Sequence, residues 1–275
     1  MATIVEALGK IALIGGGKMG EAIVAGLVNG ALFDPKTIVV ATPGAERRAY
    51  LSETYGIDCV AEGAQIAHPR TALLAVKPQA LRAVAEALTA APAFDPLRVI
   101  SIAAGITTAT LSELFPHAAV IRVMPNAPLM VSAGMSAVCV ASQTPRSEGE
   151  IVCELFSLMG EALLLDEALI NAATAINGSG PAYFALFVQE LAQAGEKAGL
   201  APASALLLAQ QTMAGTARYL ELTGQTPQQL MDAVTSPHGT TQAALEAFVA
   251  RDVAGTIQAA TQAAVHRAEE LACPS

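Results

Sequence analysis

The stretch IGGGKMGEAIVAGLVNG, residues 14–30, places closely spaced glycines between an aliphatic run and an amphipathic segment. Gly15, Gly17 and Gly20 fit the pattern G-x-G-x-x-G where a short strand would end and a helix begin. In that setting the first glycine makes the turn, the second lets a pyrophosphate approach the backbone, and the third packs the helix against the strand. The alternative is a sharp turn that carries no ligand.

Short aliphatic runs recur along the first part of the chain, at residues 11–15, 37–42, 71–76, 98–104, 119–124, 134–141 and 161–166. They hardly alternate with polar residues, which is typical of strands buried on both faces of a parallel sheet. The segments between them are long enough for crossover helices, and only helical periodicity follows. We therefore expect an α/β chain: a Rossmann-type, doubly wound, mostly parallel sheet over residues 1–166, then an all-helical domain over residues 167–275.

Composition narrows the classes of partner. The chain is 53% hydrophobic and 14% charged, which leaves more apolar surface than one monomer hides and favours self-association. With 15 basic and 24 acidic residues, a net charge of −9 and no basic cluster, nucleic acid is not expected as a partner. No apolar run reaches the roughly 18 residues of a membrane span, and the N-terminus lacks the positive charge of a secretory signal, so we expect a cytoplasmic protein. The four cysteines are widely separated, which predicts inert thiols and no metal site.

The second strand predicts the type of dinucleotide. It ends at Thr42, without the carboxylate that usually holds the ribose hydroxyls of NAD. Arg47 and Arg48 follow at the start of the next helix, where they could pair with a 2′-phosphate. NADPH is therefore favoured, with NADH as the alternative. The competing interpretation of the two arginines is an ordinary solvated helix face.

A second concentration of chemistry lies in DAVTSPHGTTQAALEAF, residues 232–248. Its residues Ser236 to Gly239 interrupt one helix, and Thr240 and Thr241 stand where the next begins. Such a loop presents backbone N–H groups and hydroxyls to an anion of carboxylate size. A plain helix N-cap is the other interpretation, and the residues alone leave the two open.

Several blocks together resemble the pyrroline-5-carboxylate reductase family. In chain order they are IGGGKMGEAI, LLAVKPQAL, ISIAAGIT, IRVMPNAPLMVSAGMSAV, AINGSGPAYF and VTSPHGTTQAALEAF, and they extend from residue 11 to about residue 248. The resemblance implies reduction of the cyclic imine 1-pyrroline-5-carboxylate to proline with NADPH. It also implies that the helical domain dimerises and lends its anion loop to a neighbouring subunit's cofactor, with larger rings of dimers known in the family.

The resemblance assigns roles to individual residues. The substrate carboxylate would lie on backbone amides around Ser236, Gly239, Thr240 and Thr241, with the Thr241 hydroxyl, the predicted catalytic group, near the ring nitrogen. Lys77 invites a general-acid role, but in the family contact there is largely through backbone. The expected cofactor-binding residues are Gly15, Gly17, Lys18, Met19, Gly20, Thr42, Arg47, Arg48, Ala75, Val76, Lys77, Pro78, Ala104 and Asn126.

Three positions depart from the family's usual pattern. His238 stands where glycine is usual, Asn177 where serine is usual, and Ser132-Ala133 where Gly-Glu or Gly-Ala is frequent. A titrating His238 beside a carboxylate would make substrate binding depend on pH. A solvent-facing loop side chain is the interpretation we prefer.

Two other functions compete with imine reduction. β-Hydroxyacid dehydrogenases and relatives of 6-phosphogluconate dehydrogenase share the G-x-G-x-M-G opening and a helical second domain. They need a catalytic lysine early in that domain, and residues 182–195 contain none. The other alternative is a non-catalytic NADP-binding protein with a regulatory role.

Overall fold

The computed structural model describes residues 3–30 and 32–272. They divide into two compact units. The first comprises the chain up to Ser179 together with the segment from Ala264 onward, and the second is Gly180–Ala263. The predicted division after residue 166 stays a prediction.

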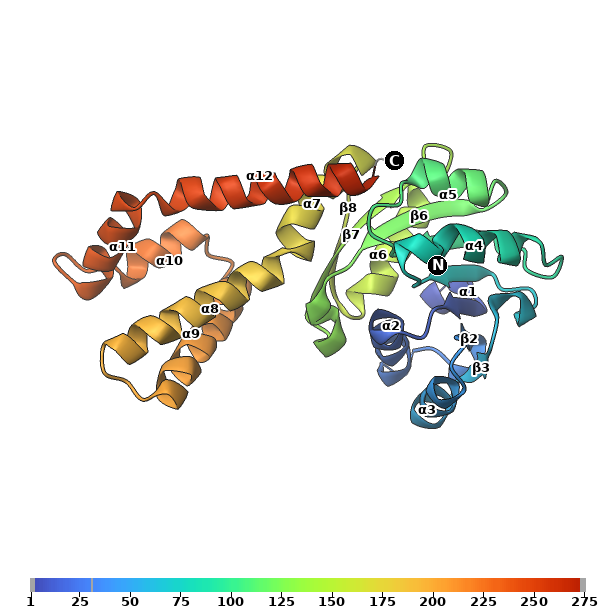
Figure 1. Cartoon of the computed structure of the whole chain (residues 1–275), viewed down its shortest axis with the longest axis horizontal. Coiled ribbons are helices and arrows are strands. Elements are labelled where there is room, and N and C mark those ends of the chain that lie inside the picture. Colours follow the sequence, from blue (N-terminus) through green and yellow to red (C-terminus); the bar gives the residue numbers. More distant parts are fainter. Residues whose placement is uncertain (1–2, 31, 273–275) are drawn as a thin grey trace. The chain divides into compact units, whose positions relative to one another are not determined.

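The described residues of the first unit form one sheet of eight strands in the order β3-β2-β1-β4-β5-β6-β7-β8 (Figure 1). All neighbouring strands run parallel except β6 and β7, which are antiparallel. The order reverses between β1 and β4, which is the switch point where open α/β sheets bind ligands. The strands are β1 Ile11–Ile14, β2 Ile38–Ala41, β3 Asp58–Val60, β4 Thr71–Leu74, β5 Arg98–Ser101, β6 Ala119–Met124, β7 Gly134–Val140 and β8 Gly160–Leu164.

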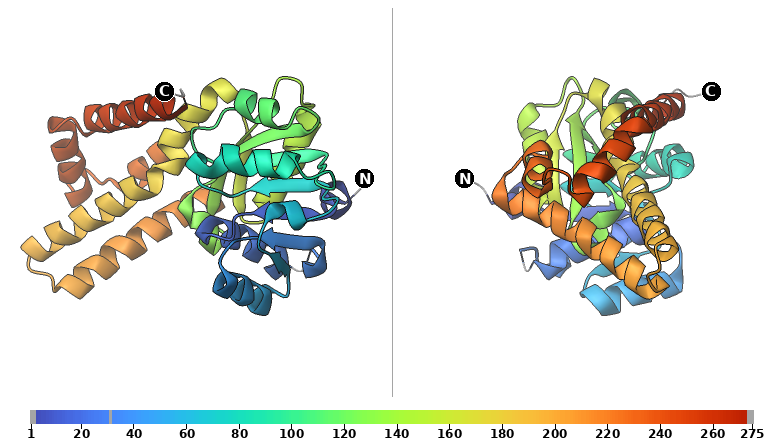
Figure 2. Two further views of the ribbon diagram at one scale, coloured as in Figure 1. Left: turned by 45° about the vertical axis from the view of Figure 1, so that its right-hand side comes forward. Right: turned by 90° about the vertical axis from the view of Figure 1, so that its left-hand side faces the viewer.

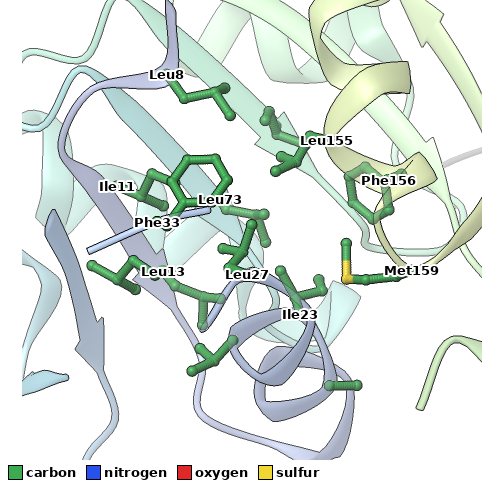
Figure 3. Packing of buried hydrophobic residues seen from close by; sticks show 14 of the residues in the cluster. Leu8, Ile11, Leu13, Ile23, Leu27, Phe33, Leu73, Leu155, Phe156 and Met159 are labelled. Carbon is green, nitrogen blue, oxygen red and sulfur yellow. The ribbon is translucent and has the colours of Figure 1, made fainter. Parts of the chain in front are cut away.

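Helices cover both faces of this sheet, as the unalternated strands require. Ile11 and Leu13 of β1 enter one core, whereas Ala12 and Ile14 enter the other. Figure 3 shows the first core, in which side chains of β1 and α2 meet Leu155, Phe156 and Met159. The longer helices are α2 Lys18–Asn29, α3 Ala45–Tyr55, α4 Pro78–Thr89, α5 Thr108–Leu114 and α6 Arg146–Ser157, with the short α1 Ile4–Leu8 and α7 Ile170–Ala173.

The predicted doubly wound sheet is confirmed, and every predicted run overlaps a strand. Strand β3 was not predicted, because it has three residues, begins with exposed Asp58 and lies at the sheet edge. Helix α1 was also not predicted. It begins with a capping box, in which Thr3 accepts from the backbone of Glu6 and the Glu6 carboxylate accepts from the backbone of Thr3.

The second unit is helical, as expected. Its helices are α8 Gly180–Lys197, α9 Pro202–Thr223, α10 Pro227–Val234 and α11 Thr240–Ala250, and it includes the first part of α12 Val253–Ala272. Helices α8 and α9 lie side by side in both views of Figure 2. Small residues allow this close packing: Gly195 faces Ala205, and the buried cluster is Val188, Ala192, Ala205 and Ala209.

Large apolar side chains of this helical unit remain exposed in the single chain. The described examples on α8 and α9 include Phe184, Leu186, Phe187, Leu191, Leu206, Leu207 and Leu208. An exposed apolar surface of this extent is typical of a protein interface.

Candidate functional site

The turn after β1 needs a glycine at Gly15. Its φ of 113° lies in a region that L side chains rarely adopt, and a Cβ there would lie 2.5 Å from the carbonyl oxygen of Ala75. The Gly15 N–H donates to the carbonyl of Ala41 at 2.9 Å. The first glycine therefore holds the turn against the ends of β2 and β4.

The other two motif glycines differ in what surrounds them. A Cβ on Gly20 would overlap the carbonyl oxygen of Gly15, so this glycine lets α2 pack against the turn. A Cβ on Gly17 would meet nothing within 4 Å, and Gly17 is the N-cap of α2 without a side-chain cap. A tight turn alone would not require a glycine at that open position, whereas a phosphate that approaches the backbone would. Residues Lys18 and Met19 form the first turn of this helix, and the site fits a dinucleotide pyrophosphate.

The residues after β2 lie next to the glycine turn. Thr42 is buried, and a Cβ on Gly16 would lie 3.1 Å from the Cβ of Thr42. Arg47 donates from Nε to the carbonyl of Gly16 at 2.6 Å, and Arg48 donates from Nη1 to the carbonyl of Thr42 at 2.9 Å. Neither arginine is on a freely solvated helix face, because both are half-buried and bonded to the edge of the cradle.

Glu21 is a residue of this region that the sequence interpretation missed. Its carboxylate forms an ion pair with Arg47 and accepts hydrogen bonds from Tyr50 at 2.9 Å and Tyr55 at 3.1 Å. Burial raises the pKa of Glu21, but the hydrogen bonds from Arg47 and the two tyrosines outweigh it and leave that pKa below its usual value. The available signal was an acid directly after the third motif glycine, followed by tyrosines on the helix that carries Arg47.

The block after β4 meets the turn from the other side. Ala75 donates its N–H to the carbonyl of Ile14 at 2.8 Å, and Val76 is half-buried beside it. Lys77 is the N-cap of α4 without a side-chain cap, and Pro78 is its first residue. The Lys77 side chain is exposed, so what the fold fixes here is the backbone.

Ala104 and Asn126 follow β5 and β6 at the same edge of the sheet. Ala104 is exposed, whereas Asn126 is buried. The Asn126 side chain accepts from the N–H of Met135 at 2.9 Å and donates to the carbonyl of Asn177 at 3.1 Å. Both ends of this amide are therefore bonded within the fold, which positions the neighbouring segments.

The predicted cofactor residues lie along one edge of the sheet. Parallel strands bring their carboxyl ends to one edge of a sheet, and the segments after β1, β2, β4, β5 and β6 all lie there. The predicted substrate residues Ser236, Gly239, Thr240 and Thr241 lie in the helical unit.

Two of the departures from the family pattern fall where the backbone favours glycine. Ser132 has a φ of 55° and His238 a φ of 60°, both left-handed. Asn177 lies in a π-helical turn, Thr174–Gly178, and donates from Nδ2 to the carbonyls of Met124 at 2.8 Å and Met135 at 3.0 Å. These bonds join the turn to β6 and β7.

The loop between α10 and α11 is closed by its own contacts. Gly239 donates its N–H to the carbonyl of Ser236 at 2.9 Å, and a Cβ on Gly239 would overlap the Ser236 hydroxyl. The N–H of His238 donates to Oε1 of Gln242 at 2.8 Å. Two amides of the loop are thus already bonded, and Gln242 is a participant that the sequence interpretation missed.

Helix α11 begins at Thr240, as predicted, with Gly239 as an N-cap that has no side-chain cap. In the described chain no hydrogen bond engages the hydroxyls of Ser236, Thr240 or Thr241. A plain N-cap would use one of these hydroxyls on the helix. Their freedom, with the first-turn amides of α11, fits an anion site.

Within residues 3–30 and 32–272, no group of three or more His, Cys, Asp or Glu could hold a metal ion. No helix among them has both the length and the apolarity to cross a membrane. Cys59, Cys139 and Cys153 are free, and burial raises the pKa of each thiol, which makes it less reactive. Cys273 lies outside the described residues.

Comparison with known proteins identifies the family. A pyrroline-5-carboxylate reductase from Synechocystis is 40% identical over 263 residues, which cover 95% of this chain and 98% of the relative. The chain belongs to the pyrroline-5-carboxylate reductase family. Residues 167–271 match the model described as pyrroline-5-carboxylate reductase dimerisation, and residues 10–105 match the one described as NADP oxidoreductase coenzyme F420-dependent.

Solved structures of family members agree in fold. A pyrroline-5-carboxylate reductase from Coxiella burnetii has a TM-score of 0.90 at 31% identity, covering 97% of this chain and 100% of that one. The Plasmodium falciparum pyrroline carboxylate reductase with NADP bound has a TM-score of 0.80 at 25% identity, covering 97% and 99%. The resemblance drawn from the sequence blocks is confirmed.

Proposed function

We propose that the chain reduces 1-pyrroline-5-carboxylate to L-proline, the last step of proline biosynthesis, with a hydride from a nicotinamide cofactor. The observation that carries the proposal is 40% identity to a pyrroline-5-carboxylate reductase over 95% of the chain. The open position at Gly17 and the free hydroxyls of Ser236, Thr240 and Thr241 around the start of α11 are consistent with it.

The cofactor's pyrophosphate would lie on the first turn of α2, next to Gly17. Its adenosine ribose would lie near Thr42, and its nicotinamide ribose near the Ala75–Pro78 block. The reduced nicotinamide supplies the hydride when bound. The residues at this edge of the sheet would hold the cofactor against the imine, and such positioning would contribute most of the rate. NADPH is the proposed cofactor because no carboxylate follows β2 and two arginines do, and NADH is the alternative.

The substrate carboxylate would bind the first-turn amides of α11 with the hydroxyls of Ser236, Thr240 and Thr241. The hydride would add to the carbon of the protonated imine, the C=N π electrons would pass to nitrogen, and the proton already on that nitrogen would stay there as the N–H of proline. Thr241 would orient that nitrogen through its hydroxyl, directly or through water. His238 has its side chain exposed on this loop, in line with the solvent-facing interpretation.

We also propose that the exposed apolar faces of α8 and α9 are covered by a second copy of the chain, as a homodimer or a larger ring of dimers. The match of residues 167–271 to a dimerisation model supports this. A cytoplasmic location stays a prediction.

The test is loss of NADPH absorbance when the purified chain is given 1-pyrroline-5-carboxylate, with β-hydroxyacids and NADP⁺ as the control reaction. Thr241→Ala should lower turnover severely and leave NADPH binding intact, and Thr241→Ser, which keeps the hydroxyl, should restore most activity. Activity on hydroxyacids alone would favour the dehydrogenase alternative. No turnover of either substrate by a chain that binds NADPH would favour the regulatory one.

Full activity of Thr241→Ala would show that the hydroxyl is incidental.

The dehydrogenase alternative requires a catalytic lysine early in the helical domain. The chain does not provide it on α8, because the only lysine of that helix is its last residue, Lys197.

A further inference from the structure

The two adjacent arginines at the start of α3 are not equivalent. Both lie at the edge of the nucleotide cradle, and both are candidates to bind a 2′-phosphate. Arg47 has a carboxylate partner, Glu21, whereas Arg48 is bonded only to backbone carbonyls. The difference determines which of them carries an uncompensated positive charge.

The charge of Arg47 is offset and its side chain is held in place. Its Nη2 is paired with Glu21, its Nε donates to the Gly16 carbonyl at 2.6 Å, and its guanidinium lies 5.1 Å from the ring centre of Tyr50. The pair is only 32% and 21% exposed, respectively, which limits screening by solvent. Moving Arg47 onto a phosphate would break this ion pair.

Glu21 is fixed from its other side as well. Its Oε1 accepts from Tyr50 at 2.9 Å and from Tyr55 at 3.1 Å, so three donors hold the carboxylate. A carboxylate held this way stays where it is when an anion approaches, and it repels that anion.

Arg48 differs on each point. Its Nη1 donates to the carbonyls of Thr42 at 2.9 Å and Pro43 at 2.7 Å, which anchors it at the end of β2. No carboxylate in the described ranges pairs with it, and the nearby Asp58 is bonded to Lys36 at 2.9 Å. The end of β2 is where a Rossmann domain holds the adenosine ribose, so this cation lies where a 2′-phosphate would project.

We infer that Arg48 is the residue that selects a 2′-phosphorylated dinucleotide, and that Glu21 withholds Arg47 from that task and so moderates the preference for NADPH over NADH. The inference rests on the proposed function only in that the cradle binds a nicotinamide dinucleotide. It concerns affinity and is independent of which substrate is reduced.

The experiment measures dissociation constants of NADPH and NADH by titration calorimetry, without substrate, for the full chain. Arg48→Gln should weaken NADPH about tenfold and leave NADH within about twofold, because a charge-assisted bond to phosphate is lost. Arg47→Gln should change the ratio of the two constants by less than about threefold. Glu21→Gln should favour NADPH over NADH by about a further fivefold, because Arg47 is released and a repulsion is removed.

The control for Glu21→Gln is Glu53→Gln, which removes the same charge from an exposed position of α3, the helix that carries both arginines, and should leave the ratio unchanged. In the double variant Glu21→Gln/Arg47→Gln, most of the added preference for NADPH over NADH should disappear. Thermal unfolding of each variant checks its fold. Adenosine 2′,5′-bisphosphate and AMP, titrated in the same way, report the 2′-phosphate without the nicotinamide.

An equal loss for Arg47→Gln and Arg48→Gln, or a weaker NADPH preference in Glu21→Gln, would overturn the inference. If both dinucleotides bind with the expected ratios but the imine is not reduced, the proposed function fails and the inference stands. A chain that binds neither dinucleotide overturns both.

Discussion

The pair Gly17→Ala and Gly20→Ala separates a phosphate cradle from a mere turn, because one methyl group enters open space and the other enters backbone. At Gly17 the φ is −72° and the added Cβ meets nothing within 4 Å. Loss of a preferred N-cap residue is offset by reduced freedom of the unfolded chain, so unfolding free energy should change by less than about 1 kcal/mol. At Gly20 the Cβ overlaps the Gly15 carbonyl, and the forced shift of the turn should cost about 1–3 kcal/mol.

Cofactor affinity should fall in Gly17→Ala even though the stability of this variant hardly changes. The Gly17 methyl would occupy the space through which a pyrophosphate reaches the amides of α2, so NADPH should bind at least about tenfold more weakly, or about 1.4 kcal/mol. Chemical denaturation gives the stabilities, and titrations followed by NADPH fluorescence give the affinities. A stable Gly17→Ala variant that binds NADPH within about threefold of the parent would refute the cradle.

Three further predictions follow from other contacts. Glu148→Ala should lower unfolding free energy by about 2–4 kcal/mol in denaturant titrations, because Arg98, 6% exposed, would keep only neutral partners; a change below about 0.5 kcal/mol would contradict this. Burial, then Glu167, raises the pKa of Cys139 from 9.0 to about 12, so the folded thiol keeps its proton where the unfolded one loses it. The protonated thiol's contribution to the free energy of unfolding is intact below pH 9 and falls as the pH rises toward 12. Cys139→Ala should therefore make that free energy depend less steeply on pH over this range, and an unchanged slope would refute the assignment. His238→Gly should raise the unfolding temperature slightly, by relief of up to about 1 kcal/mol of left-handed strain, and a lower value would show that the side chain stabilises the loop.

The fold was largely predictable because its strands are buried on both faces. The run at residues 71–76, for example, is apolar throughout after Thr71, and the glycines from Gly15 mark the turn between the first strand and the helix that follows. Strand β3 was not predicted because it has only three residues and begins with exposed Asp58. Cys59 and Val60 pack against different cores, and two residues alone form no recognisable pattern. The antiparallel β6–β7 pair also leaves no trace in single-strand composition.

The site was predictable where backbone conformation dictates the residue type. Gly15 and Gly20 follow from a positive φ and a close approach, and local sequence shows such needs. Hydrogen-bond and ion-pair partners that tertiary packing brings together could not be predicted from local sequence. Glu21 meets Arg47 only because α2 and α3 lie next to each other in the fold. The bond from Asn126 to the carbonyl of Asn177 likewise depends on the π-helical turn that contains Asn177.

The most direct test of the proposed chemistry is to follow the hydride itself. The chain is supplied with NADPH deuterated on the transferred face of C4 and with 1-pyrroline-5-carboxylate, and the product is examined by mass spectrometry. Direct transfer to the imine carbon predicts proline with one deuterium at C5 and unlabelled NADP⁺. Proline without label, or no proline while NADPH remains bound, would contradict hydride transfer by this chain.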